Sequence, residues 1–198
     1  MAARVSAPRA RPERPPDATG QLVTREQLAS MPDGEGRTEL ILGRVVRMPP
    51  AFAKHCGLSG NIAVAAGPSM SAAQPCQVLI AEPGFMLRRR PDTVRVPDVA
   101  FVLRERYDAA VLAGGYVEGP PDIAVEVISE SQARAQLEDK VAEYLEAGGR
   151  LVWVIDPEAR VARVYRPGSQ VEEVAADGVL SGEDVIPGLM VPLADVFR

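Results

Sequence analysis

Lysine is almost absent from this chain of 198 residues. Of its 22 cationic side chains only Lys54 and Lys140 are lysine, and the rest are arginine. Arginine therefore supplies the ordinary positive surface charge of this sequence, so a lysine calls for a specific explanation. A lysine presents a compact ammonium group and can lose a proton when it is buried, which arginine cannot do. Each lysine is thus a candidate for a specific role.

Cysteines and long apolar runs are also scarce. Cys56 and Cys76 are the only cysteines, and their spacing fits neither a metal finger nor a disulfide framework. No apolar run approaches the ~20 residues that cross a bilayer. The N-terminal residues lack the hydrophobic stretch of a signal peptide. We therefore expect a cytoplasmic protein that is not inserted in a membrane.

The net charge of −5 excludes a protein that coats nucleic acid through its overall field, although a local basic groove stays possible. Hydrophobic residues make up 46% of the chain and charged residues 25%, as in ordinary globular proteins. Residues 1–20 are rich in Pro, Ala and Arg and contain almost no side chain that could pack, so we expect a disordered tail. Residues 21–198 are expected to form one domain.

The first half of the chain predicts short elements. Thr24 and Gln27 have the spacing of a capping box and predict a helix over residues 25–29. Two β-rich runs around Gly43 predict a hairpin. Further along, the pattern predicts a helix over 53–66, strands over 77–81, 85–87 and 96–103, and an irregular covering loop over 104–121.

The second half predicts a strand–helix–strand unit. Residues 122–129 and 151–156 are near-continuous apolar runs, typical of central strands buried on both faces. Between them, Ser129 and Gln132 repeat the capping-box spacing and begin a helix that ends at Gly148-Gly149. Residues 161–166 and 170–175 predict an antiparallel pair at the sheet edge. The fold class is therefore α/β, a mixed central sheet flanked by helices.

Two carboxylates stand out on the predicted strands. Glu126 lies in the middle of an apolar strand, where an ionised carboxylate costs several kcal/mol unless cations or hydrogen bonds compensate. Asp98 lies near the start of the strand predicted over 96–103. If the strands are neighbours, the two charges repel by about 3 kcal/mol at ~5 Å. A hard divalent cation, Mg²⁺ or Mn²⁺, would remove that conflict.

Lys140 falls on the inward edge of the predicted helix, beside Leu137 and Tyr144 and away from the acids Glu138 and Glu143. It can therefore direct its ammonium group at the two carboxylates. There it would orient or deprotonate a water and offset transition-state charge. Two structural alternatives stay open. Asp98 could accept hydrogen bonds from backbone N–H groups at the start of its strand, and Glu126 with Lys140 could form a plain buried ion pair.

The segments TELILGRVV, RVPDVAFV, PDIAVEVIS, EDKVAEYLEAGGR, LVWVIDP and LSGEDVIPGLMVPLADVF, in this order, resemble the Uma-two family of restriction-endonuclease-like proteins. The resemblance covers nearly everything from residue 22 to the end. It implies a PD-(D/E)xK core, with the first acid at Asp98 and the next at Glu126. The usual lysine position holds Ile128, so the resemblance implies that the lysine has moved to the next helix, at Lys140.

The resemblance also places the glutamate of an early E-L-I-x-G segment at Glu39, as a residue that supports the metal site. His55, next to Lys54, could contact a phosphate, and an ordinary surface or capping histidine is the alternative. The chain departs from the family pattern around both residues. Thr38 and Leu42 stand where Tyr and Asp are common, and Cys56 replaces the second residue of a His-Gln pair.

Four arginines flank the Asp98 strand and could position a phosphate backbone: Arg88, Arg89, Arg90 and Arg95. The alternative for such a run is a solvated turn. Together with the resemblance, these residues predict a metal-dependent endonuclease that hydrolyses phosphodiester bonds in DNA. A homodimer is also expected. A second hypothesis is a catalytically inactive nuclease fold that serves as an interaction or dimer scaffold, which the acidic net charge favours.

Deleting residues 1–20 tests the expected tail. Because these residues lack packing side chains, the shortened chain should unfold at nearly the same temperature as the full chain. A fall of several degrees in the melting temperature would show that the segment docks on the body or on a partner subunit.

Overall fold

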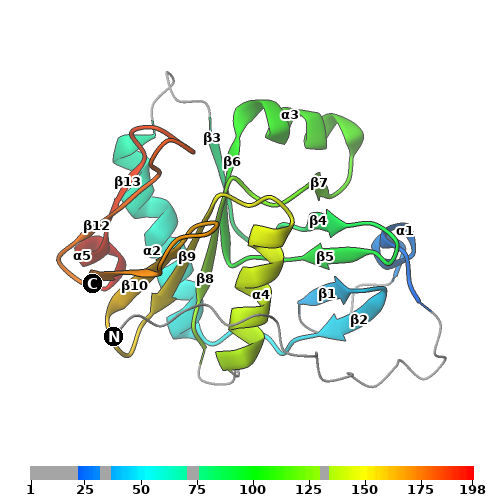
Figure 1. The fold of residues 1–198 in the computed structure, drawn as a ribbon, viewed down its shortest axis with the longest axis horizontal. Helices are drawn as coiled ribbons and strands as arrows, with labels where there is room; N and C mark the ends of the chain where they lie inside the picture. Colours follow the sequence, from blue (N-terminus) through cyan, green and yellow to red (C-terminus); the bar gives the residue numbers. More distant parts are fainter. Residues whose placement is uncertain (1–21, 32–36, 71–75, 130–133) are drawn as a thin grey trace.

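The computed structural model describes residues 22–31, 37–70, 76–129 and 134–198 (Figure 1). The tail expected over 1–20, and Gln132 of the second capping box, lie outside the described residues. The first capping box is confirmed. Thr24 Oγ1 accepts from the backbone N–H of Gln27, and Gln27 Oε1 accepts from the backbone N–H of Thr24. None of the helices in the described part of the chain has the length and apolar character needed to cross a bilayer.

The larger sheet has six strands. Their order is β11 (Glu172–Ala175), β10 (Val161–Tyr165), β9 (Leu151–Asp156), β8 (Ile123–Val127), β6 (Val99–Leu103) and β3 (Cys76–Leu79). β8 and β9 are parallel, as a strand–helix–strand connection requires, and the other neighbours are antiparallel. The central position predicted for the apolar runs is therefore confirmed.

A second sheet has five strands. Their order is β2 (Arg44–Arg47), β1 (Thr38–Ile41), β5 (Thr93–Arg95), β4 (Phe85–Arg88) and β7 (Val117–Glu118). The predicted hairpin is β1–β2, joined by Leu42 and Gly43 with φ of 50° and 75°. Positive φ at both turn residues matches the right-handed twist of the two strands. The predicted single mixed sheet is thus divided into two mixed sheets.

Helices cover both faces of the six-stranded sheet. They are α2 (Ala53–Ala66), α3 (Arg104–Ala113), α4 (Arg134–Glu146) and α5 (Leu193–Val196), with a 3₁₀ turn at Gly67–Ser69. The remaining helix, α1 (Arg25–Ala29), packs through Leu28 on the five-stranded sheet. On one face α2, α5 and the small sheet of β12 (Val179–Ser181) and β13 (Met190–Pro192) pack over Phe101 and Trp153. On the other face α4 packs through Leu137, Val141 and Tyr144. Figure 1 shows α4 between this sheet and the β1–β2 hairpin.

The covering loop predicted over 104–121 is wrong. This stretch contains α3 and β7. None of the residues of α3 is fully buried, and its packed side chains, Tyr107 and Ala110, are only partly buried, so its apolar stripe is short. Gly114 ends the helix in the left-handed conformation, with φ of 66°. The predicted strand over 96–103 is also shorter than expected, because β5 ends at Arg95 in one sheet and β6 begins at Val99 in the other.

The C-terminal end of α4 offers a test of the packing. The N–H of Gly149 donates to Tyr144 O at 2.8 Å, and a Cβ on Gly149 would lie 2.6 Å from that oxygen. We expect Gly149→Ala to lower the free energy of unfolding by about 1–3 kcal/mol in chemical denaturation. The control is Gly60→Ala in α2, where a Cβ meets nothing within 4 Å and helix propensity favours alanine by up to ~1 kcal/mol. Equal effects of the two substitutions would contradict this account.

Candidate active site

The chain passes from the five-stranded to the six-stranded sheet at Val96-Pro97-Asp98, and this crossing brings Asp98 beside Glu126. The N–H of Asp98 donates to Val125 O at 3.2 Å, which extends the pairing of β6 with β8 by one residue. In return, the N–H of Val127 donates to Asp98 Oδ2 at 2.8 Å. One oxygen of Asp98 thus has the structural role that the sequence left open as an alternative.

The other oxygen of Asp98 faces two cationic or basic groups. Arg37 Nη1 lies 2.5 Å and His55 Nε2 lies 3.0 Å from Asp98 Oδ1. Burial alone would raise the pKa of Asp98. The hydrogen bond from His55 and the charge of Arg37 outweigh it and hold the pKa well below its usual range. His55 is therefore held at the cluster rather than exposed on the surface, and its buried Nδ1 has no hydrogen-bond partner among the described residues.

Lys140 joins three separate parts of the chain. Its ammonium group donates to Glu126 of β8 at 2.9 Å and to Val96 O, at the crossing, at 2.8 Å. Glu39 Oε1 of β1 lies 3.0 Å away. The position on α4 follows from the helix period, because Lys140 is one turn from Leu137 and from Tyr144 on the packed side of the helix. The buried ion pair considered from the sequence is present, with Glu39 as a second partner.

Glu126 is the one acid of the cluster whose pKa is raised, to about 7. Burial is the largest cause and the charge of Asp98 adds to it, while the charges of Lys140 and Arg37 oppose the shift without cancelling it. The hydroxyl of Tyr144 donates to Glu126 Oε1 at 3.0 Å, and burial raises the pKa of Tyr144 well above its usual value. Near neutral pH this carboxyl can therefore take up or release a proton.

Glu39 is held in the opposite electrostatic state. Its oxygens accept from Arg95 Nη1 at 2.6 Å and from the N–H of Val96 at 3.0 Å. Although burial opposes ionisation, the charges of Lys140 and Arg95 lower the pKa of Glu39 to about 2. Glu39 is therefore an anion held between Lys140 and Arg95, and its support of a metal site stays a prediction.

Arg95 lies in the interior and not in the exposed basic turn where the sequence placed it. Its Nε lies 2.5 Å from Glu143 Oε2, and its Nη1 contacts Glu39. Glu143, expected on the outer, solvated arc of its helix, is nearly buried for the same reason. The helix period identifies the side of α4 that faces the six-stranded sheet, but it contains no information about the second sheet that covers another side.

Arg88, Arg89 and Arg90 lie elsewhere. Arg88 ends β4, and Arg89 and Arg90 lie in the exposed turn that follows. Arg89 Nη2 pairs with Glu118 at 2.8 Å. None of the three contacts the described residues of the charged cluster, so their predicted role in nucleic-acid binding is separate from the chemistry there.

Sequence reasoning missed Arg37 and the hydroxyl of Tyr144. Tyr144 was assigned to the apolar stripe, and its ring does pack there while its oxygen reaches Glu126. The available signal was the need of a buried tyrosine hydroxyl for a partner. No pattern pointed to Arg37, because it precedes β1 and meets Asp98 only through the tertiary fold.

Among the described residues, acidic and basic side chains lie together in one buried cluster. The residues with 8% or less of their surface exposed are Glu39, Arg95, Asp98, Glu126 and Lys140, and Arg37 and Glu143 lie at the rim. Because ionised groups are costly to bury, burial is the largest cause of the raised pKa of Glu126, and the charge of neighbouring Asp98 adds to it.

The donors of this cluster fit a hard cation in type. Asp98 and Glu126 offer oxygen atoms on neighbouring strands, which Mg²⁺ prefers, and Mg²⁺ is commonly bound by one or two carboxylates with water completing its shell. The described residues contain no group of three or more His, Cys, Asp or Glu side chains arranged to hold an ion. A cation here would therefore rest on these two carboxylates.

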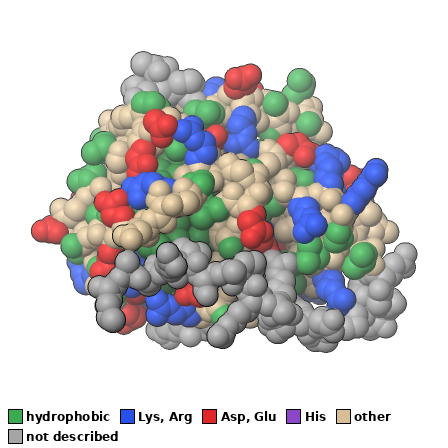
Figure 2. Space-filling view, in the orientation of Figure 1, with side chains coloured by type: hydrophobic (Ala, Val, Ile, Leu, Met, Phe, Trp, Pro, Cys, Tyr) green, Lys and Arg blue, Asp and Glu red, His purple; other side chains and the backbone are tan. Residues whose placement is uncertain are grey.

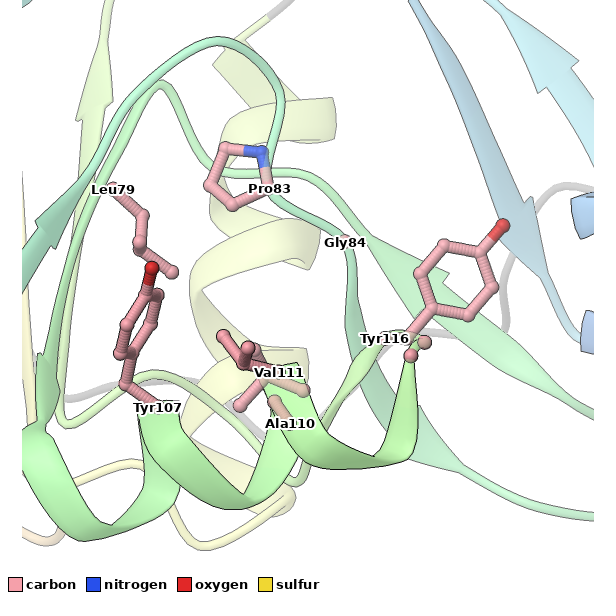
Figure 3. Close-up of a pocket in the computed structure, with 10 residues that line it drawn as sticks. Leu79, Pro83, Gly84, Tyr107, Ala110, Val111 and Tyr116 are labelled. Carbon is pink, nitrogen blue, oxygen red and sulfur yellow. The ribbon is translucent and has the colours of Figure 1, made fainter.

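An apolar pocket lies apart from this cluster, between α3 and the segment around Pro83 (Figure 3). Tyr107 and Val111 of α3 face Leu79 and Pro83 across it. Its lining contains none of the acids or bases predicted for catalysis, and we assign it no part in the chemistry.

A comparison with family models gives a match over residues 25–194, to the Uma2 family described as "Putative restriction endonuclease". The chain belongs to this family. The fold class expected from the sequence agrees with a solved structure from Anabaena variabilis, described as a putative nuclease belonging to DUF820. The likeness has a TM-score of 0.73 at 20% identity and covers 88% of this chain and 97% of that one. No functionally curated protein matches the chain.

Glu126→Gln tests the charge balance through pH. A folded-state pKa of about 7, above the ordinary value of 4.5, means that the folded chain binds the extra proton between these values. The contribution of Glu126 to stability is then lost as the pH rises from about 4.5 to about 7. Glutamine does not titrate, so the variant should gain stability relative to the parent between pH 5 and pH 8 in chemical denaturation. A variant that is much less stable at both pH values would mark Glu126 as a purely structural ion-pair partner of Lys140.

Proposed function

We propose that this chain hydrolyses phosphodiester bonds in DNA with the help of Mg²⁺ or Mn²⁺. The family match supports a nuclease. The observation that carries the proposal further is the buried pair of Asp98 and Glu126 beside Lys140, in which the pKa of Glu126 is raised. Perturbed pKa values of this kind, produced by burial together with a specific like-charged neighbour, are typical of functional sites.

Asp98 and Glu126 are the residues that would hold the cation. When bound, such a cation polarises a phosphoryl oxygen and lowers the pKa of a water. Its positive charge would also offset the repulsion between Asp98 and Glu126, so the donor set suits it in both charge and atom type. Glu39 supports the arrangement by keeping Lys140 in place.

The chain's own side chains would hold the reacting groups and stabilise the negative charge that develops on the phosphate. In hydrolysis, a water oxygen forms a bond to phosphorus while the bond from phosphorus to the leaving oxygen breaks, giving a phosphomonoester and a hydroxyl. With a cation held by Asp98 and Glu126, both carboxylates would be ionised, and the proton of the attacking water would pass to the solvent. Lys140 supplies positive charge beside Glu126. Because Lys140 donates to two carboxylates and a carbonyl, an orienting and charge-stabilising role suits it better than proton removal.

A second function is favoured by one observation. The oxygens of Asp98 and Glu126 already accept hydrogen bonds from protein groups, namely Arg37, His55, the N–H of Val127, Lys140 and the hydroxyl of Tyr144. A cluster so fully paired can serve structure alone. The alternative is therefore an inactive nuclease fold that acts as an interaction scaffold or as a homodimer.

Cleavage of supercoiled plasmid separates the two functions. With Mn²⁺ or Mg²⁺ the parent should nick the plasmid, and Asp98→Asn, Glu126→Gln and Lys140→Arg should each lose at least about a hundredfold in rate, as expected when a positioned charge is removed or displaced. The control is Glu138→Gln, an exposed acid on the same helix, which should keep the parent rate.

Unfolding of each variant is measured on the same preparation, so that loss of fold is not mistaken for loss of catalysis. If a folded Lys140→Arg variant cleaves at the parent rate, Lys140 is only a structural cation. Absence of cleavage by the parent with either ion and either nucleic acid, DNA or RNA, would favour the scaffold.

A further inference from the structure

Charge is unevenly distributed over the molecule. The segments that form α1, β1, β2, β4 and β5 (residues 22–31, 37–48 and 85–95) carry eight cationic and three anionic side chains. Residues 134–198, by contrast, carry seven cationic and twelve anionic ones. Figure 2 shows blue side chains predominating on the right, over the five-stranded sheet and α1. The negative net charge of the whole chain therefore conceals a basic side.

The turns at one end of the five-stranded sheet bring arginines together. The N–H of Gly43, in the β1–β2 turn, donates to Asp92 O at 2.7 Å, which joins it to the β4–β5 turn. The N–H of Arg25 donates to Asp92 Oδ2 at 2.9 Å, which adds the start of α1. The arginine surface, as we define it, consists of Arg25, Arg44, Arg47, Arg88, Arg89 and Arg90.

β2 connects this surface to the charged cluster. It runs along the edge of its sheet from Arg44, beside the turns, to the exposed Arg47, about 10 Å away at the usual rise of a strand. Arg47 pairs in register with Thr38. The residue before Thr38, Arg37, contacts Asp98. Basic side chains thus lie at both ends of β2 and, through Arg37, at the cluster.

The protein's own acids neutralise this surface only in part. Glu118 pairs with both Arg25 and Arg89. Arg47, Arg88 and Arg90 form no ion pair with any carboxylate of the described residues. Exposed guanidinium groups without protein anions are suited to an external anion, and their fork of donors matches phosphate oxygens in pairs.

We propose that the arginine surface binds the phosphate backbone of a nucleic acid and directs it along β2 toward Asp98. The direction toward Asp98 rests on the proposed function, whereas the binding does not. The length of β2 corresponds to about three phosphates of one strand along a duplex axis. Arg95 and His55, which the sequence grouped with this role, are instead held inside the cluster.

Two triple variants that change the net charge equally test the proposal. One is Arg47→Gln, Arg88→Gln and Arg90→Gln on the arginine surface. The other is Arg104→Gln, Arg134→Gln and Arg150→Gln, three exposed arginines outside it. Binding to a labelled DNA duplex is followed by fluorescence anisotropy over a range of salt concentrations. EDTA is present, so that cleavage plays no part.

The first triple should weaken binding at least tenfold and flatten the plot of log K against log salt by about 2–3, since each neutralised phosphate contributes about 0.9 to its slope. The second triple should bind within about twofold of the parent. Equal weakening by both triples would overturn the proposal, because overall charge alone would then explain binding.

A third arm replaces DNA with vesicles containing anionic lipid. Vesicle binding as tight as DNA binding, lost in the same triple, would overturn the nucleic-acid assignment. The experiment is independent of catalysis. A parent that binds DNA through this surface but cleaves nothing would refute the proposed hydrolysis and leave the binding surface standing.

Discussion

Lys140 is the contact on which the arrangement of the two sheets depends. Its ammonium group, on α4, meets Glu126 in the six-stranded sheet, Glu39 in the five-stranded sheet, and the carbonyl of Val96 where the chain passes between them. A buried ammonium without partners would cost several kcal/mol, so these acceptors and the lysine position one another. Arg95 reinforces the same junction through Glu39 and Glu143. In a sequence whose other cations, apart from the exposed Lys54, are all arginines, a compact cation stands where three backbone segments converge.

The same junction places its carboxyl groups in different electrostatic environments. Glu39 and Asp98 have lowered pKa values because each lies against an arginine, whereas Glu126 shares Lys140 with Glu39 and also faces Asp98. One site thus contains fixed anions and one carboxyl that titrates near neutrality. This difference in environment is what acid–base chemistry requires, since it assigns different roles to chemically similar groups. Structure and proposed function therefore depend on one set of contacts.

Much of this was predictable from the residue pattern. Two charged residues stand at positions where the pattern predicts apolar ones. They are Glu126, within an apolar strand, and Lys140, on the inward edge of a helix, and the fold brings them together. What sequence could not supply was the division of the sheet, because Arg95 and Asp98 lie three residues apart yet belong to different layers. Periodicity describes how one element faces another, so the contacts of Arg37 with Asp98, between segments far apart in the chain, had no local signal. α3 was missed because its apolar stripe is short and only partly buried, at Tyr107 and Ala110.

Calorimetric titration of Mn²⁺ into the protein at pH 6.5, in buffers of different ionisation enthalpy, tests the central claim most directly. With a pKa of about 7, Glu126 is mostly protonated at this pH, so a cation held by Asp98 and Glu126 must displace its proton. The parent should bind Mn²⁺ and release a fraction of a proton, while Glu126→Gln should lose both signals and Glu138→Gln should keep them. Unchanged Mn²⁺ affinity in Glu126→Gln, or no binding by the parent, would contradict the account.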